Sequence, residues 1–277
     1  MRELVADLSN WRAIAVDGAD APTWLNDLVS ADTSTLRPGE ATRSLLLSPT
    51  GRVRGEFTVA RTRDGWLLLQ DPAQANRIDA LLTPYLLSSD VVLMDRTGQL
   101  AIFAFPKLTT APEHEGTWAS ALSCLGAGID LLAPVSRHDS LVAEFTEDFA
   151  LADADDLEAW RVDAAIPRFG RDATEDDLPQ ECGLASAVSF EKGCYLGQEA
   201  VAKVRNLGHP RRVLLALETT APVSPGDAVC ANGSEVGTVT SAARGADTFV
   251  LLAKVRWDAR DQPLRRVTGA ELTPRWR

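Results

Sequence analysis

The sequence contains few of the residues from which disulfides and metal sites are built. Its 277 residues include four cysteines and three histidines, and no two cysteines are separated by only two residues. A chain of this size needs no disulfide to fold, and without paired spacing a zinc site or a resident cluster site is disfavoured. We therefore expect no metal site formed by the protein itself.

Long apolar runs are lacking as well. No stretch approaches the roughly 18 consecutive apolar residues that a membrane helix requires. The first seven residues contain two acids and no apolar run, which is not the pattern of a secretory signal. We expect a cytoplasmic protein without membrane association.

Basic residues are outnumbered, with 28 Lys and Arg against 39 Asp and Glu and a net charge of −11. This balance opposes general binding to nucleic acid, so we expect no stable nucleic-acid complex. The charge is uneven: residues 139–181 hold fourteen acids and three Arg, whereas residues 203–277 hold twelve basic residues and seven acids. The basic tail is interpreted as a solvated surface, with a surface for an acidic partner as the alternative.

What the chain does contain is a mixture of strand-like and helix-like patterns. Short apolar runs predict strands at residues 43–47, 53–60, 66–69, 91–94, 100–105 and 141–145, the first two forming a hairpin. Helical spacing and start signals predict helices at residues 24–29, 71–87, 117–125 and from Asp153 to about Ala165. The mixture favours an α+β fold over a doubly wound parallel sheet.

After Pro210 the pattern changes to short apolar runs separated by turn residues. The runs cover residues 213–217, 228–230, 236–239 and 249–255. Strands at this spacing predict a small all-β sandwich or barrel. We therefore divide the chain into residues 1–208 and a C-terminal domain of residues 209–277.

Residues 190–199 carry the most distinctive chemistry. Cys194 lies between two glycines and two positions after Lys192, whose ammonium group would favour the thiolate. Glu199 could oppose that effect or hold Lys192 in place, and a helix beginning at Glu199 would add a favourable dipole. From the residues alone, an activated thiol and a buried structural cysteine are equally well supported.

Glu181 lies upstream in a loop that also contains Cys182 and Gly183. A carboxylate in such a loop is either a solvated turn residue or an acceptor for a set of N–H donors, such as the aminopyrimidine edge of a pterin. Arg205 can likewise meet a carboxylate or face water. The spacing of these residues does not decide between a solvent-facing and a ligand-binding role, either for Glu181 or for Arg205.

Residues 192–199, Lys-Gly-Cys-Tyr-Leu-Gly-Gln-Glu, closely resemble the signature of the YgfZ-type proteins, folate-binding relatives of the glycine cleavage T-protein. The resemblance extends through residues 201–212 and 160–184 and, more loosely, through residues 25–53. It implies a T-protein-like folate-binding region (residues 1–208) followed by a β-barrel (residues 209–277). It also implies a role in assembling or repairing iron–sulfur proteins, including cluster enzymes that modify tRNA.

The same resemblance assigns roles to individual residues. Cys194 matches the family's characteristic cysteine, with Lys192 as its catalytic companion, and Glu181 is similar to the T-protein carboxylate that contacts the pterin. The residues expected to contact tetrahydrofolate, or another reduced folate, are Glu181, Tyr195, Gln198, Glu199 and Arg205. The expected partners are folate and iron–sulfur client or assembly proteins. The thiol could accept iron, a cluster or sulfur, or respond to oxidants, and a transferase-like activity is left open.

The main alternative is a folate-dependent aminomethyltransferase of the T-protein type. Those enzymes carry an Asp pair shortly after a Gly-Gly turn, and the matching positions here are Gly55 and Glu56. A Glu places its carboxylate one methylene farther out, which disturbs a geometry-sensitive step. A non-catalytic folate-binding module with a structural Cys194 is a second alternative. A flavin-linked demethylase is disfavoured because the chain has no GxGxxG motif.

Overall fold

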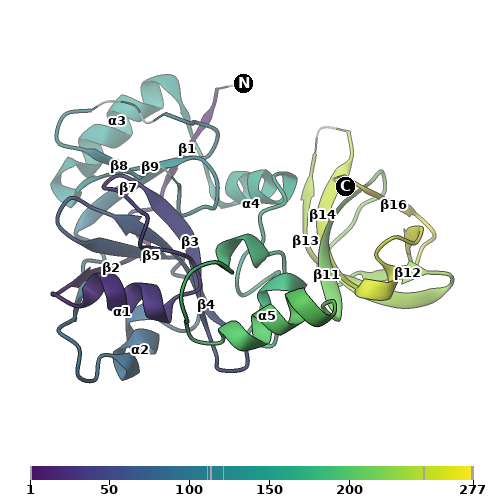
Figure 1. Cartoon of the computed structure of the whole chain (residues 1–277). Helices are drawn as coiled ribbons and strands as arrows, with labels where there is room; N and C mark the ends of the chain where they lie inside the picture. The colour runs from purple at the N-terminus through teal and green to yellow at the C-terminus, as the bar shows by residue number, and fades with distance from the viewer. Residues whose placement is uncertain (1, 111, 113, 121, 246, 276–277) are drawn as a thin grey trace. The chain divides into compact units, whose positions relative to one another are not determined.

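The computed structural model describes residues 2–110, 112, 114–120, 122–245 and 247–275 (Figure 1). By their internal contacts these residues form two compact units. Unit 1 comprises residues 1–47, 54–153 and 187–196, and unit 2 comprises residues 48–53, 154–186 and 197–277. The chain passes between the units several times, and the boundary near residue 208 stays a prediction.

Unit 1 contains two five-stranded sheets. The first has the strand order β10-β1-β7-β9-β8 and the second β3-β4-β5-β2-β6. The strands are β1 (Leu4–Asp7), β2 (Arg12–Asp17), β3 (Ala41–Leu47), β4 (Val53–Arg61), β5 (Trp66–Gln70), β6 (Val92–Asp95), β7 (Leu100–Phe105), β8 (Trp118–Ser120), β9 (Ile129–Pro134) and β10 (Ala150–Leu151). The helices are α1 (Ala21–Leu28), α2 (Ile78–Leu82) and α3 (His138–Asp148).

Helix α1 begins at a proline-containing first turn and buries one side against the second sheet. Pro22 lies where a missing N–H costs nothing, and Leu25 and Leu28 join the core cluster that includes Phe57 and Leu68. The first sheet is covered by α3, whose buried Leu141 and Phe145 pack with sheet residues such as Phe103. Each sheet of unit 1 therefore has its own helix-covered core.

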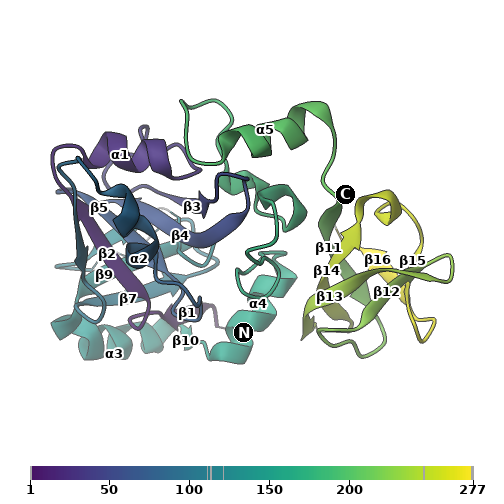
Figure 2. The same cartoon turned by 90° about the horizontal axis from the view of Figure 1, so that it is seen from below.

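Unit 2 is organised around a closed barrel with the strand order β11-β14-β13-β12-β15-β16. The elements are α4 (Ala154–Asp163), α5 (Gln198–Leu207), β11 (Arg212–Thr219), β12 (Ala228–Ala231), β13 (Ser234–Arg244), β14 (Phe249–Arg256), β15 (Leu264–Arg266) and β16 (Glu271–Pro274). Helix α4 lies beside strands β13 and β14 (Figure 2). Its Val162 packs against Val250 and Leu252 of β14. The barrel thus has an apolar interior and one outer face covered by α4.

A buried ionic network reinforces the packing of α4. Arg161 pairs with Asp172 at 2.7 Å, and its guanidinium also donates to Ser241 of β13 at 2.6 Å. The Asp172 carboxylate in turn accepts hydrogen bonds from Thr240 and Ser241. This network ties a helix, a loop and a barrel strand of unit 2 together.

The α+β prediction is confirmed, and so is the small C-terminal barrel. The predicted strands at residues 43–47, 53–60, 66–69 and 100–105 correspond to β3, β4, β5 and β7, and the helices predicted from residue 24 and after Asp153 correspond to α1 and α4. These elements have strong local signals, which explains the agreement.

Two predictions of element type were wrong. Residues 141–145 belong to helix α3, because Leu141 and Phe145 are four residues apart and share a helical face. The helix predicted at residues 117–125 is replaced by strand β8, which pairs with β9. Ala121 lies outside the described residues. In this segment Ser123 and the Cys124 backbone N–H hydrogen-bond to the buried Asp130, which fixes a loop rather than a helix.

The helix predicted at residues 71–87 is much shorter. Asp71 accepts a hydrogen bond from the backbone of Ala73 and so closes a turn at the start of the segment. Only Ile78–Leu82 is α-helical, followed by a 3₁₀ turn at Thr83–Tyr85 that contains Pro84. The proline removes a helical hydrogen bond and ends α2.

Among the described residues, no helix combines the length and the apolar character needed to cross a membrane.

Candidate functional site

Cys194 is the exposed cysteine of this chain. Cys182 is buried, and Cys124 and Cys230 are partly buried. The alternative that Cys194 is a buried structural residue is therefore wrong. Exposure gives the thiol access to a reactant, which any nucleophilic or metal-accepting role requires.

The chain segment that carries Cys194, residues 187–196, is fixed to unit 1 at its start. Ser30 lies just after α1; its hydroxyl donates to the Ala187 carbonyl at 2.6 Å, and its own carbonyl accepts from the Ser189 N–H at 2.9 Å. The Ser189 hydroxyl then accepts from the backbone N–H of Lys192 at 3.3 Å. The exposed thiol is thus carried by an anchored loop.

Lys192 provides the second anchor. Its ammonium group donates to the backbone carbonyls of Asn26, Val29 and Ala31, at 2.5 Å for Val29 and 2.8 Å for Ala31. Helix α1 ends at Leu28, so the Asn26 carbonyl belongs to the set that a helix leaves unpaired at its C-terminus, Val29 is the C-cap residue, and Ala31 lies in the segment that follows. A cation at this end is also favoured by the helix dipole. Lys192 therefore acts as a C-terminal cap for α1.

Burial lowers the pKa of Lys192 to about 8, whereas the negative charges of Asp32 and Asp27 act to raise it. The group remains mainly protonated at neutral pH, as three carbonyl acceptors require, since a neutral amine has only two N–H donors. The ammonium donates these three hydrogen bonds to the backbone of unit 1. The expected effect of Lys192 on Cys194 stays a prediction.

Tyr195 is buried, and its hydroxyl group has no hydrogen-bond partner among the described residues. The Lys192 ammonium lies 4.8 Å from the centre of its ring, within range of a cation–π interaction. Burial also raises the pKa of Tyr195 to about 12, so the hydroxyl stays a donor. A buried hydroxyl without a partner is costly, and a bound ligand is one way of satisfying it.

After Tyr195 the chain enters unit 2 and begins α5. Gly197 has φ = 81°, a left-handed conformation that favours glycine, and it immediately precedes the helix. Gln198 and Glu199 form the first turn, and Arg205 lies in the last turn. Gly193 does not have a positive φ, so only the second glycine of the motif serves a special backbone conformation.

Glu181 is 8% exposed and lies at the end of a 3₁₀ turn, Pro179–Glu181. One carboxylate oxygen accepts from the Leu178 N–H at 3.1 Å, and the other accepts from the Arg211 N–H at 3.2 Å. Beside it, Gln180 donates to the Val201 carbonyl at 2.9 Å, which orients its amide. The Gln180 Oε1 atom is buried and unpartnered among the described residues.

The predicted site residues are distributed over both units. Lys192, Cys194 and Tyr195 lie in unit 1 on one anchored segment. The other four lie in unit 2, and they are Glu181, Gln198, Glu199 and Arg205. Sequence reasoning missed the three carbonyl acceptors of Lys192 and the orphaned oxygen of Gln180. Backbone acceptors leave no signal in a sequence, whereas Gln180 directly precedes the predicted site residue Glu181.

At the two positions that match the T-protein Asp pair, this chain has Gly55 and Glu56. Gly55 has no side chain, and a Cβ atom added there would lie 3.2 Å from Leu81. The carboxylate of Glu56 is held by Arg43, whose Nε donates to it at 2.5 Å. This part of unit 1 therefore lacks a carboxylate at the first position and has an ion-paired one at the second.

We expect replacement of Lys192 by Met to loosen the Cys194 segment. The three carbonyls would lose their donor, and leaving buried acceptors unsatisfied costs about 2 kcal/mol of unfolding free energy. Hydrogen exchange of residues 187–196 should accelerate, and the urea midpoint should fall. Lys107→Met, at an exposed position of the same unit, is the matched control. Equal exchange rates in the two variants would show that the ammonium does not anchor the segment.

Comparison with known proteins gives a consistent result. Residues 2–106 match the GCVT N-terminal domain family. A putative chloroplastic transferase from Arabidopsis thaliana is 25% identical over 272 residues, covering 86% of this chain and 61% of that protein. The chain thus spans less than two thirds of that relative. The tRNA-modifying protein YgfZ from Aliivibrio fischeri (strain MJ11) is 26% identical over 270 residues, covering 89% of this chain and 83% of that protein.

The fold is also that of a solved structure, the glycine cleavage system aminomethyltransferase T from Bartonella henselae. The two share a TM-score of 0.84 at 19% sequence identity, with 99% of this chain and 85% of that chain covered. The predicted T-protein-like fold is therefore confirmed.

Proposed function

We propose that this relative of YgfZ, which has the fold of the aminomethyltransferases, binds a reduced folate and serves the assembly or repair of iron–sulfur proteins through Cys194. The observation that carries the proposal is the exposed thiol on an anchored loop, within the YgfZ-type motif of residues 192–199. The protein would act in the cytoplasm, with iron–sulfur client or assembly proteins as partners. Its clients would include cluster enzymes that modify tRNA.

The polar groups of the chain fit a folate. A pterin presents N–H donors on its aminopyrimidine edge, and Glu181 and the orphaned Gln180 Oε1 are neighbouring acceptors in one loop of unit 2. Each Glu181 oxygen accepts one backbone N–H and retains further acceptor capacity. We assign Glu181 to the pterin.

Other folate groups are assigned to the remaining motif residues. The unpartnered hydroxyl of Tyr195 is a donor for a folate acceptor, and Gln198 and Glu199 add polar groups at the start of α5. Arg205 is a cation that suits the carboxylates of the glutamate part of a folate. Folate itself supplies one-carbon chemistry when bound, whereas the residues of this chain bind and orient it.

Cys194 is assigned the cluster-related step. An exposed thiol that ionises can accept iron, a cluster or sulfur, and it can also be oxidised reversibly. Anchoring the loop fixes the position of the thiol while leaving it open to a partner protein. In this proposal an iron–sulfur cluster is cargo that passes to or from the partner proteins.

The second candidate function is aminomethyl transfer, which the fold likeness supports. Against it stand Gly55, which offers no carboxylate, and Glu56, whose carboxylate is paired with Arg43. A step that requires a precisely placed carboxylate loses much of its rate when that group is absent or displaced by one methylene.

An assay of methylene transfer from an aminomethyl-lipoyl carrier protein to tetrahydrofolate separates the two functions. We expect the wild-type chain to show no transfer above the rate without enzyme, while a bona fide aminomethyltransferase assayed in parallel turns over. Transfer at a rate comparable to that enzyme, and unaffected by Cys194→Ala, would overturn the proposal in favour of the aminomethyltransferase.

A further inference from the structure

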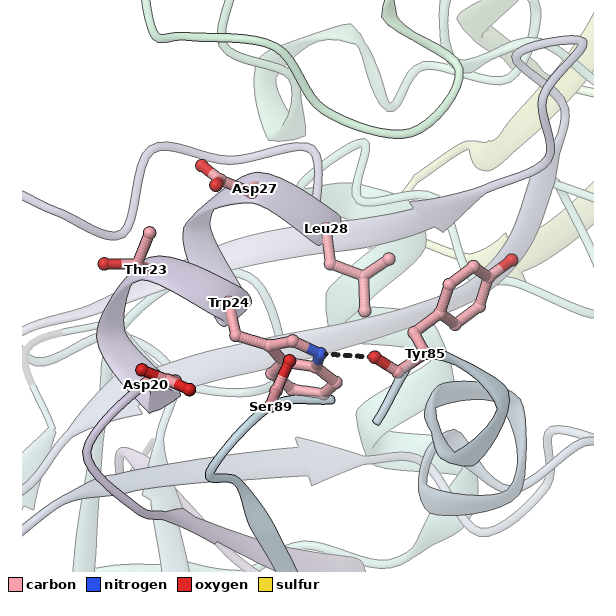
Figure 3. A pocket seen from close by; sticks show the side chains of 7 residues that line it. All are labelled: Asp20, Thr23, Trp24, Asp27, Leu28, Tyr85 and Ser89. Atoms are coloured by element: carbon pink, nitrogen blue, oxygen red, sulfur yellow. Dashed lines mark hydrogen bonds between the residues drawn. The ribbon is translucent and has the colours of Figure 1, made fainter. Parts of the chain in front are cut away.

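A pocket of about 460 Å³ lies on unit 1 between α1 and the segment that follows α2 (Figure 3). A volume of this size is in the range of sites that hold a small ligand or a large side chain. The residues that line it are Asp20, Thr23, Trp24, Asp27, Leu28, Tyr85 and Ser89. None of them belongs to the motif of residues 192–199.

Two aromatic residues form its apolar part. The Trp24 indole N–H donates to the backbone carbonyl of Tyr85 at 2.8 Å, as the dashed line in Figure 3 shows. Because this bond uses the only polar atom of the indole, the rest of the ring offers apolar and π surface. The Tyr85 side chain is 39% exposed, so it is available to a ligand.

The charged residues that line the pocket are all acidic. Among the seven described lining residues two are aspartates, Asp20 and Asp27, and none is basic. Both are exposed, and Asp20 uses one oxygen to accept the Asp90 N–H at 2.8 Å. Aromatic faces and carboxylates together select a cation that also carries apolar surface.

The chain segment that supplies Tyr85 and Ser89 to the pocket also carries exposed apolar residues. Seven large hydrophobic residues are exposed among those described, and three of them, Tyr85, Leu87 and Val92, fall within eight consecutive positions. Leu87 is 84% exposed and Val92 is 51% exposed. Ser88 between them has φ = 68°, a conformation that non-glycine residues adopt at some energetic cost. Exposed apolar groups on a chain segment that also lines a pocket favour a protein interaction surface over a site for a small metabolite alone.

We propose that this pocket is a docking site for an arginine side chain of a partner protein, presented with apolar residues on either side. The planar guanidinium stacks on the faces of Trp24 and Tyr85, and its N–H groups donate to Asp20 and Asp27. The flanking apolar residues of the partner cover Leu87 and Val92. This interaction does not depend on folate binding or on the chemistry of Cys194.

Helix α1 connects the pocket with the loop that carries Cys194. Helix α1 supplies Trp24 and Asp27 to the pocket, and the carbonyls of Asn26 and Val29 at its C-terminal end hold Lys192. A partner docked at the pocket is therefore held beside the helix that anchors the Cys194 loop.

The test uses the full chain and the peptide acetyl-Leu-Arg-Leu-amide, followed by NMR at the assigned Trp24 indole N–H and Tyr85 ring signals. We expect saturable shifts with a Kd of about 1 mM. The same peptide with citrulline, which has the shape of arginine but no charge, should bind at least about fivefold more weakly. The double variant Asp20→Asn/Asp27→Asn should weaken binding of the arginine peptide by a similar factor, because both changes remove charge and keep shape.

Asp64→Asn, at an exposed position in the turn between β4 and β5, is the matched control and should bind like the wild type. Equal binding of the citrulline peptide, unchanged binding in the double variant, or the absence of saturable shifts would each overturn the proposal. Equally tight binding of arginine amide alone would also overturn it, because the exposed apolar residues Leu87 and Val92 would then contribute nothing.

Discussion

Replacing Cys194 by Ala is expected to remove the protein's contribution to iron–sulfur enzymes without unfolding it. The side chain is exposed, and substitutions at such positions usually change stability by less than about 0.5 kcal/mol. In cells that lack the protein and are grown under oxidative stress, the wild-type chain should restore cluster-enzyme activities. The Cys194→Ala variant should leave those activities at the level of the deletion strain.

The control for this experiment is Cys230→Ala, which removes a partly buried cysteine on β12. That variant should restore activity as the wild type does, because its thiol has no assigned role. Both variants should be present at wild-type levels, as measured by immunoblot. Normal cluster-enzyme activities in the Cys194→Ala strain would contradict the role assigned to the thiol.

Replacing Asp172 by Ala is expected to have the largest effect on stability. The carboxylate is fully buried, pairs with Arg161 at 2.7 Å and accepts the Arg168 N–H at 3.1 Å. Removing it takes the fully buried one of two carboxylates away from the Arg161 guanidinium, which keeps Glu158 at 2.5 Å, and leaves the Arg168 N–H without this acceptor. Breaking a buried pair from one side costs about 3–5 kcal/mol. The urea midpoint of unit 2 should fall accordingly.

Arg171→Ala provides the matched comparison for Asp172. Arg171 also belongs to this group of charges, but its side chain is 52% exposed and pairs with Glu158 at 2.7 Å. Exposed ion pairs contribute about 0–1 kcal/mol, so its midpoint should stay close to that of the wild type. If the two variants unfolded at the same urea concentration, the buried pair would not be the element that holds α4 to the barrel.

The fold was predictable where local patterns and long-range packing agree. Helix α1 has proline at its start and apolar residues on one side, and the C-terminal strands alternate with clear turn signals. The prediction for residues 141–145 failed because their helical spacing was taken for a strand, whereas those for residues 71–87 and 117–125 failed because side-chain hydrogen bonds outweigh the hydrophobic pattern. Asp71 closes a local turn with the backbone of Ala73 inside a helix-like segment. Asp130 fixes the loop before β9 through the Cys124 N–H, six positions earlier.

The sequence directed attention to Cys194, and the structure shows that this cysteine is exposed. Its chemistry and the folate that the family resemblance implies stay predictions. The position of Lys192 could not be predicted, because its partners are backbone carbonyls of Asn26, Val29 and Ala31, more than 150 positions earlier. The pocket at Trp24 was equally hidden, since it forms only when α1 meets the segment around Tyr85.

The central claim is tested most directly by calorimetric titration of the full chain with tetrahydrofolate under reducing conditions. We predict saturable binding by the wild type and at least about tenfold weaker binding by Glu181→Gln, because the amide removes the charge that favours the pterin donors. Glu175→Gln, at an intermediate-exposure position of the same unit, should bind like the wild type. No binding by the wild type, or unchanged binding in a Glu181→Gln variant that melts normally, would contradict the account.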